Sequence, residues 1–363
     1  MIVRWLIGLS LGTLIIAATS PWFVRSYVPR QFDEARQRVV LKPGESYRWR
    51  AEGYATTSVG PHGMMGRTNL PTSDGSAAFV LALWGDSQAE GVSVADTDKL
   101  WRQLESALGD GAANGDQSDV EVQVIPLASS GDDAGSWRRQ MPLVERELNV
   151  DGHVLLLCEM VDLMGMVEPL DDRASVGSVD LANTNSLANW IPDFVVHAGR
   201  NLSTDPQTTK RRRLRFGIGP VPTYTPPTQV TFLEESDRVA AEGWIAGNLN
   251  AIRAAATKPI WIVYAPRCPL IMDGELRVND PDGHLWDIVE QNAEANSFEV
   301  IDCRDVFRDS VERSVFPHGF HNGQFGNGHL NAVGYRLISR EFAKRWGGAE
   351  ILVHSAEVSG AAE

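Results

Sequence analysis

Short, continuous apolar runs alternate with amphipathic segments along most of the chain. Continuous apolar runs are typical of strands buried on both faces of a parallel sheet, and five such strands are predicted at 77–84, 120–128, 153–160, 260–265 and 298–302. Apolar residues at three- and four-residue spacing predict helices at 96–108, 136–148 and 332–345. This alternation predicts an α/β fold with a central parallel sheet of about five strands and helices on both faces.

The first apolar run differs from the others in length. The run from Trp5 to Val24 has no charged residue and contains about 20 residues, enough to cross a bilayer as a helix. Tryptophans near both ends suit the membrane interface. Two interpretations stay open for residues 1–24: a retained signal anchor, or a signal peptide cleaved near 18–20. Either would export the remaining chain, although four arginines at 25–38 weaken the charge argument for that orientation.

The remaining chain divides by composition. Residues 25–75 are polar and punctuated by glycine and proline, which predicts a linker and a domain edge, and 76–348 form the main domain. The polar stretch 163–235 predicts an insertion that covers one end of the sheet without folding independently. Its basic run 210–215 is either a solvated face or a site for anionic lipid or acidic glycan. Residues 349–363 are predicted to be a tail.

Charge and cysteine content exclude some functions. The chain has 47 acidic and 33 basic residues and a net charge of −14, which argues against nucleic-acid binding. Cys158, Cys268 and Cys303 allow at most one disulfide, and their spacing does not suggest a zinc site.

The strongest chemical signal is Gly85-Asp86-Ser87, directly after the first predicted strand. A serine at this position projects from the carboxyl end of a strand, where open α/β sheets bind their ligands. Backbone N–H groups at such a turn can face an oxyanion. The tripeptide alone would also fit a simple helix cap, so the wider sequence has to decide between the two.

The wider sequence resembles the SGNH hydrolases, also called GDSL-type esterases, and in particular an exported subgroup associated with bacterial polysaccharide acylation. Residues 83–105 are similar to the first block of the family, 128–133 (ASSGDD) to the second, and 326–338 (GNGHLNAVGYRLI) to the last. The resemblance covers about residues 60 to 345 and leaves the insertion unmatched. It implies an SGNH or flavodoxin-like three-layer fold, to which the membrane-spanning or signal segment is added.

The resemblance also implies roles for individual residues. Ser87 would be the nucleophile and His329 its base, within hydrogen-bonding contact of each other, and the backbone N–H groups of Ser87 and Gly131 would form the oxyanion hole. No cofactor and no metal are implied. A second Asp-Gly-His sequence at 282–284 precedes the last predicted strand and lacks the Asn-x-x-Gly continuation, so we interpret it as a surface loop.

Two positions depart from the family pattern. Val161 stands where the family has an oxyanion-hole asparagine, and valine cannot donate a hydrogen bond. Asn327 stands near the family's aspartate, and an amide can orient His329 without supplying charge. Asn327 is therefore expected in the catalytic set, on the His329 side of the site, with Glu159 or Asp162 as alternative sources of the missing charge. The residues expected to bind substrate are Asp86, Asp162 and His321.

The resemblance implies an exported serine ester hydrolase or O-acyltransferase that acts on O-acyl groups, above all acetyl, of an extracytoplasmic glycan. The expected partners are an acylated polysaccharide or small acyl ester, the membrane through residues 5–24, and a membrane acyl-donor protein. The expected location is the cell envelope, facing the periplasm or exterior, or secretion if the segment is cleaved. The alternative, which Val161 and Asn327 favour, is an inactive SGNH-like domain that binds glycan or serves as a scaffold.

Overall fold

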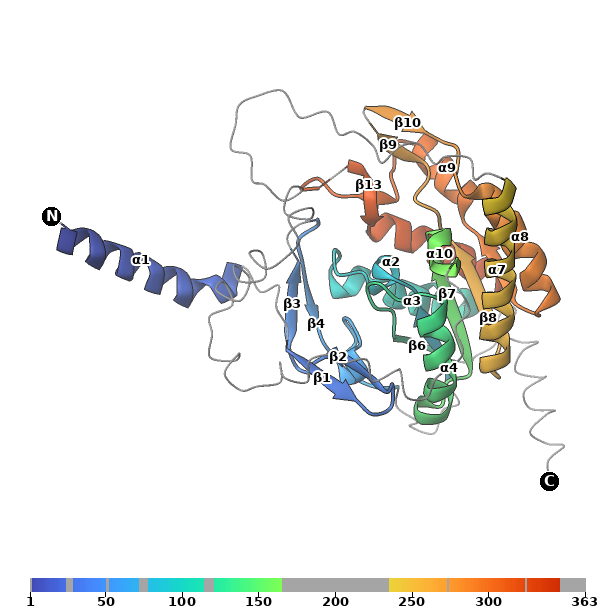
Figure 1. The fold of residues 1–363 in the computed structure, drawn as a ribbon, viewed down its shortest axis with the longest axis horizontal. Coiled ribbons are helices and arrows are strands. Elements are labelled where there is room, and N and C mark those ends of the chain that lie inside the picture. The colour runs from blue at the N-terminus through green and yellow to red at the C-terminus, as the bar shows by residue number, and fades with distance from the viewer. Residues whose placement is uncertain are drawn as a thin grey trace.

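The computed structural model describes residues 2–23, 29–49, 52–71, 78–113, 121–164, 235–272, 274–323 and 325–346. At its centre is a parallel five-stranded sheet in the order β11–β8–β7–β5–β6 (Figure 1). The strands are β5 (Phe79–Trp84), β6 (Val122–Pro126), β7 (Gly152–Leu157), β8 (Ile260–Tyr264) and β11 (Glu299–Asp302). Each overlaps one of the five predicted runs, so the predicted parallel sheet is confirmed.

Helices cover both faces of the sheet and produce three layers. One face packs against α4 (Ala134–Leu148), α7 (Glu235–Ala255) and α8 (Gly283–Ala295). The other packs against α3 (Leu100–Ala113), α9 (Arg304–Glu312) and α10 (Ala332–Arg345). Shorter elements connect them: α2 (Ser87–Glu90), η1 (Pro61–Gly63), η2 (Asp96–Asp98), η3 (Met160–Leu163), β9 (Leu270–Met272), β10 (Glu275–Arg277), β12 (His318–Gly319) and β13 (Phe325–Leu330).

Strand β5 shows why the predicted strands read as continuous apolar runs. Leu81 and Leu83 lie in the cluster with α3 and α10, whereas Ala82 and Trp84 lie in the cluster with α4 and α7. Successive side chains of a strand point to opposite faces of the sheet. A strand covered on both faces must therefore be apolar at every position.

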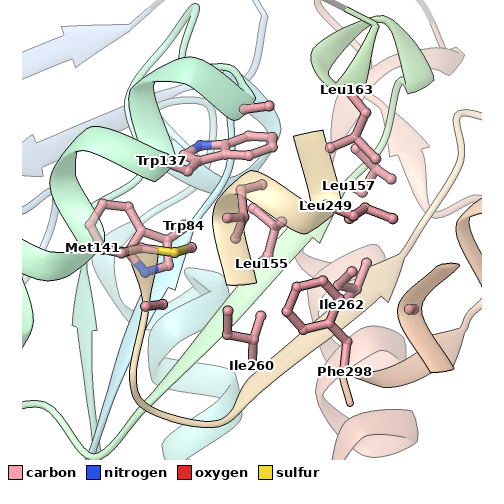
Figure 2. Close-up of a cluster of buried hydrophobic side chains, with 14 of the residues drawn as sticks. Trp84, Trp137, Met141, Leu155, Leu157, Leu163, Leu249, Ile260, Ile262 and Phe298 are labelled. Atoms are coloured by element: carbon pink, nitrogen blue, oxygen red, sulfur yellow. The ribbon is translucent and has the colours of Figure 1, made fainter. Parts of the chain in front are cut away.

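The cluster on the α4 side is built around large aromatic and aliphatic side chains. Figure 2 shows Trp84 of β5 with Trp137 and Met141 of α4, and Leu155 of β7 with Ile260 of β8. All are nearly or completely buried. Burial of side chains this large contributes about 1.5–3 kcal/mol each, so this layer holds the sheet and α4 in a fixed relation.

The predicted helix over 96–108 is wrong at its start. Residues 96–98 form the 3-10 helix η2, and the extended backbone of Lys99 separates it from α3. The carboxylate of Asp96 accepts the backbone N–H of Ser58 (3.1 Å) rather than an N–H of α3. Lys99 is buried and donates to the carbonyl of Gly91 (2.5 Å). Tertiary contacts of these side chains have therefore overridden the helical pattern.

The region predicted as a linker and domain edge contains antiparallel hairpins. They pair β1 (Arg30–Asp33) with β2 (Arg38–Leu41), and β3 (Ser46–Trp49) with β4 (Ala55–Ser58). Between β1 and β2, buried Arg36 donates to the Leu127 carbonyl (2.7 Å) and to Gln140 Oε1 (2.7 and 3.0 Å). Buried polar groups need hydrogen-bond partners, and those of Arg36 belong to the main domain. These bonds hold the β1–β2 hairpin against that domain.

Residues Ile2–Phe23 form helix α1, which extends away from the sheet in Figure 1. Among the helices of the described residues, none combines the length and apolarity needed to cross a membrane, so the predicted membrane span is not supported. The basic run 210–215 and the predicted tail 349–363 lie outside the described residues, as does the predicted insertion except at its ends.

Candidate active site

Ser87 lies on a tight turn just beyond the carboxyl end of β5. The turn begins at Gly85, whose φ is +145°; a Cβ there would lie 2.7 Å from Ala89 Cβ and 2.9 Å from the Leu156 carbonyl oxygen. The Asp86 carboxylate accepts the backbone N–H of Gln88 (2.9 Å) and caps α2. The glycine permits the close approach and the cap starts the helix, so Ser87 becomes its first residue.

His329 lies on β13 and faces this turn. Its Nε2 is 3.1 Å from Ser87 Oγ. The next residue, Leu330, donates its backbone N–H to Gln88 Oε1 (2.8 Å), which links β13 directly to α2, the helix that begins at Ser87. Asn331 then caps α10 by accepting backbone N–H groups at 2.9 and 3.2 Å. The sequence predicts Ser87 and His329 together, and the structure places them in hydrogen-bonding contact.

The carboxylate behind His329 belongs to Glu52, which the sequence analysis missed. Glu52 Oε2 lies 2.6 Å from His329 Nδ1, and Oε1 accepts the backbone N–H of His329 (2.9 Å). Glu52 lies between β3 and β4, 277 residues before His329. The residues predicted as a linker and domain edge therefore supply a member of the site.

Glycines and one asparagine allow the Glu52 carboxylate to reach this position. Gly53 has a φ of +73°, and a Cβ there would lie 2.1 Å from the Ser93 carbonyl oxygen. Asn322 holds Gly53 from both sides, accepting its N–H at 2.8 Å and donating to its carbonyl at 2.9 Å. At Gly328 a Cβ would lie 2.1 Å from Glu52 Oε1. The close contact between the hairpin and β13 thus requires residues without side chains.

The hydrogen bonds assign the proton positions. Burial alone would raise the pKa of Glu52, but the hydrogen bonds from the His329 side chain and backbone outweigh it and lower this pKa below its usual value. An ionised Glu52 accepts the Nδ1–H of His329, which leaves Nε2 free to accept the proton of Ser87. This is the tautomer that a serine nucleophile requires, at distances suited to proton transfer.

Asn327 does not occupy the position expected for it. Its Oδ1 accepts the backbone N–H of Gly328 (2.8 Å) and Arg267 Nη2 (3.3 Å), whereas Nδ1 of His329 is taken by Glu52. Arg267 also binds Glu159 (2.8 Å), so the charge of Glu159 is directed to this guanidinium rather than to His329. Asn327 is close to His329 in sequence, but the carboxylate of Glu52, from a distant segment, binds the imidazole ring instead.

The predicted oxyanion residues lie on adjacent loops. Gly131 is exposed at a turn with φ +84°, and the neighbouring Ser129 donates its N–H to the Gly85 carbonyl (3.3 Å). Within the described residues, the backbone N–H groups of Ser87 and Gly131 have no protein acceptor. Val161 lies in η3 and is 64% exposed. Its apolar side chain has no hydrogen-bond donor.

The residues expected to bind substrate divide into two groups. Burial, Asp86 and Glu159 raise the pKa of Asp162 to about 7, and burial likewise raises the pKa of Asp86. The charge of Asp86 thus acts on Asp162, and Asp86 itself accepts the hydroxyl of Ser87 (3.3 Å). His321 is exposed and stacks on Phe325, with ring centroids 5.5 Å apart. It lies on the loop that leads into β13, outside the hydrogen bonds of the site.

Among the described residues, no group of three or more His, Cys, Asp or Glu side chains is arranged to hold a metal ion. Cys158, Cys268 and Cys303 are all buried and unpaired, and burial raises the pKa of each thiol.

The comparisons with known proteins give likeness only to solved structures, since no family model and no curated protein matches the chain. One is a GDSL-like lipase from Parabacteroides merdae (11% identity, TM-score 0.40, 76% of this chain and 96% of that chain). Another is a catalytic mutant of the acetylxylan esterase Axe2 from Geobacillus stearothermophilus (11%, 0.37, 74% and 94%). A third is LAE5, an α/β hydrolase from the metagenome of Lake Arreo, Spain (10%, 0.38, 74% and 95%).

Identities and TM-scores this low carry no argument about activity, so the chemistry has to be inferred from the site. What the site provides is a hydrogen-bonded chain from Ser87 through His329 to Glu52, at the carboxyl edge of a parallel α/β sheet.

Proposed function

We propose that the protein is a serine ester hydrolase or O-acyltransferase. The observation that carries this proposal is the Ser87–His329–Glu52 chain, with contacts of 3.1 and 2.6 Å. The inactive alternative rested partly on Asn327, because an amide leaves the imidazolium without a charge partner. Glu52 supplies that charge, so this reason for inactivity is removed.

The first half of the reaction forms an acyl-enzyme. Ser87 Oγ attacks the ester carbonyl carbon, and its proton passes to Nε2 of His329. Glu52 accepts the Nδ1–H and stabilises the imidazolium by charge. The carbonyl oxygen becomes an oxyanion, which backbone N–H groups bind. When the intermediate collapses, the bond to the leaving alcohol breaks and Nε2 returns the proton to that alcohol.

The second half regenerates the serine. Water or a sugar hydroxyl attacks the acyl-enzyme, and His329 accepts its proton and then returns it to Ser87 Oγ. With water the product is a carboxylic acid; with a sugar the acyl group is transferred. We propose an O-acyl group of a glycan as substrate, acetyl above all. The sequence resemblance supports this choice. Polar groups around the site support it too, because hydroxyl-rich ligands need such partners: Asp86 accepts the hydroxyl of Ser87 (3.3 Å) and its charge acts on Asp162, and Arg267 binds Glu159 (2.8 Å) and Asn327 (3.3 Å). The location outside the cytoplasm remains a prediction.

One observation favours the second candidate, an inactive glycan-binding domain. Val161 stands where a side-chain donor is expected, and loss of one oxyanion donor typically lowers kcat about 100- to 1000-fold. The active and inactive readings therefore differ in whether the remaining backbone donors suffice.

Hydrolysis of p-nitrophenyl acetate by the purified protein tests the proposal. We expect turnover by the wild type and its loss in Ser87→Ala and in His329→Ala. The double variant should be no worse than either single variant, since the residues act as a unit. Ser136→Ala, on a partly buried serine of α4, is the matched control and should retain full activity. A folded wild type without turnover would favour the binding domain.

A further inference from the structure

The loop of residues 129–132, between β6 and α4, carries Gly131; we name it the oxyanion loop. Two bonds tie it to the nucleophile turn: Ser129 donates its N–H to the Gly85 carbonyl (3.3 Å), and Ser130 donates to Glu90 Oε2 at the end of the Ser87 helix (3.2 Å). The Asp132 N–H closes the loop on the Ser129 carbonyl (3.0 Å). The tip itself, Gly131, has no side chain with which to hold its own position.

A side chain from the N-terminal region holds the far end of this loop. Arg38, the first residue of β2, places Nη1 at 3.0 and 2.9 Å from the two carboxylate oxygens of Asp132. Asp132 is 3% exposed, and removal of one partner from so buried an ion pair is costly because it leaves the other charge uncompensated. From the same hairpin, Arg36 binds the Leu127 carbonyl just before the loop (2.7 Å). The β1–β2 hairpin therefore binds the chain both before Gly131, at Leu127, and after it, at Asp132.

We propose that Arg38 is a positioning residue for the oxyanion hole, acting through Asp132 on the backbone N–H of Gly131. This inference rests on the proposed function. It matters more in this chain than in one with a side-chain donor, because Val161 cannot donate. Stabilisation of the oxyanion then depends on backbone N–H groups, and the direction of the Gly131 N–H bond is set by the conformation of the oxyanion loop.

The assignment gives the N-terminal hairpins a combined role. The β3–β4 hairpin supplies Glu52 to His329 (2.6 Å), and the β1–β2 hairpin supplies Arg38 to the oxyanion loop (2.9 Å). The segment that precedes the α/β domain thus contacts both the histidine that transfers the proton, His329, and the loop that carries the oxyanion donor Gly131.

Kinetics of Arg38→Met, Asp132→Ala and the double variant test the proposal on p-nitrophenyl acetate. We expect kcat to fall about 10- to 100-fold in Arg38→Met, less than the full loss of an oxyanion donor, with KM nearly unchanged. The kcat of the double variant should equal that of the single variants, since Arg38 and Asp132 act through the same contact and their effects do not add. Affinity for phenylboronic acid, whose serine adduct is tetrahedral, should weaken by the same factor as kcat. Arg38→Lys, which keeps a charge, should recover part of the loss and serves if Arg38→Met fails to fold.

The matched control breaks another arginine–carboxylate pair of the same region. Arg67 binds Glu105 of α3, with side chains 13% and 15% exposed. Its other hydrogen-bond acceptors among the described residues belong to Asn69, Gln123 and Val124, which all lie outside the oxyanion loop. Arg67→Met should lower the unfolding temperature but leave kcat and boronate affinity unchanged. The inference is overturned if Arg38→Met and Arg38→Lys lower only stability, or if Arg67→Met lowers kcat equally. A wild type without ester turnover would overturn the proposed function and this inference with it.

Discussion

Glu52, and not the Asn327 that the local sequence predicts, binds Nδ1 of His329. Mutations of the two residues should therefore have different effects on kcat. In Glu52→Gln the amide would donate to Nδ1, which forces the proton onto Nε2, the wrong tautomer for accepting the Ser87 proton. We expect kcat to fall about 10³- to 10⁴-fold, as in serine triads whose carboxylate is replaced by an amide. Asn327→Ala should change kcat far less, since its amide contacts Arg267 and Gly328. Steady-state kinetics on a small ester would measure both. An inactive Asn327→Ala beside a fully active Glu52→Gln would show that Glu52 is not the residue that orients His329.

For single residues, the sequence predicts a member of the site only where its neighbours in the chain form a recognisable pattern. Ser87 follows a buried strand and His329 precedes a capped helix, so both carry a pattern in their immediate neighbours. Glu52 is 277 residues from His329 and is joined to it only by tertiary contact. The signal that was available is weak: a Glu-Gly pair, at 52 and 53, between two short segments of alternating polarity.

The approach of the β3–β4 hairpin to β13 depends on glycine at 328. Gly328 has φ +109°, and an added Cβ would lie 2.1 Å from Glu52 Oε1. Gly328→Ala should therefore displace the carboxylate, lower kcat at least tenfold, and destabilise the fold by about 1–2 kcal/mol through the left-handed backbone. Gly274→Ala is the control, because its φ is +80° with nothing within 4 Å of the added Cβ. It should show the backbone cost without loss of kcat. Wild-type kcat in Gly328→Ala would contradict this role.

At the scale of elements, burial decides what can be predicted. The five sheet strands are buried on both faces, so their apolar runs stand out from the polar segments around them. The Asp-Gly-His sequence at 282–284, predicted as a surface loop, begins α8 instead: Asp282 is at the N-cap position, and the helix starts at Gly283. Leu285 in its first turn is 2% exposed. The start of this helix has a glycine and no side-chain cap, so its first turn resembles a loop. The hairpin strands are four residues long, too short for a clear alternation.

Across the whole molecule, one carboxylate links the α4 layer to the sheet. Glu145 lies 2.9 Å from His153 Nε2 on β7 and accepts the N–H groups of Thr257 and Lys258 before β8 (2.8 and 3.0 Å). Burial opposes its ionisation, but these hydrogen bonds outweigh burial and lower the pKa of Glu145 from 4.5 to about 2. A shift of this size corresponds to about 3 kcal/mol of folding free energy. Because the folded-state pKa is the lower one, this contribution is complete above about pH 4.5 and is lost as the pH falls through about 2.

Glu145→Gln should therefore reduce the free energy of unfolding by up to about 3 kcal/mol at pH 7 and by much less near pH 2. Denaturant titrations at the two pH values would measure the difference. Glu147→Gln, on an exposed residue of the same helix, is the control and should have little effect at either pH. An equal loss at both pH values in Glu145→Gln would show that its carboxylate charge is not what links the layers.

The central claim is that Ser87 is a nucleophile activated through His329 and Glu52. The most direct measurement is labelling by a fluorophosphonate probe, with the modified peptide identified by mass spectrometry. We expect one adduct, on Ser87, absent in Ser87→Ala and formed about 10³- to 10⁴-fold more slowly in Glu52→Gln. A folded wild-type protein that forms no adduct, or that labels at the same rate without the Glu52 carboxylate, would contradict this claim.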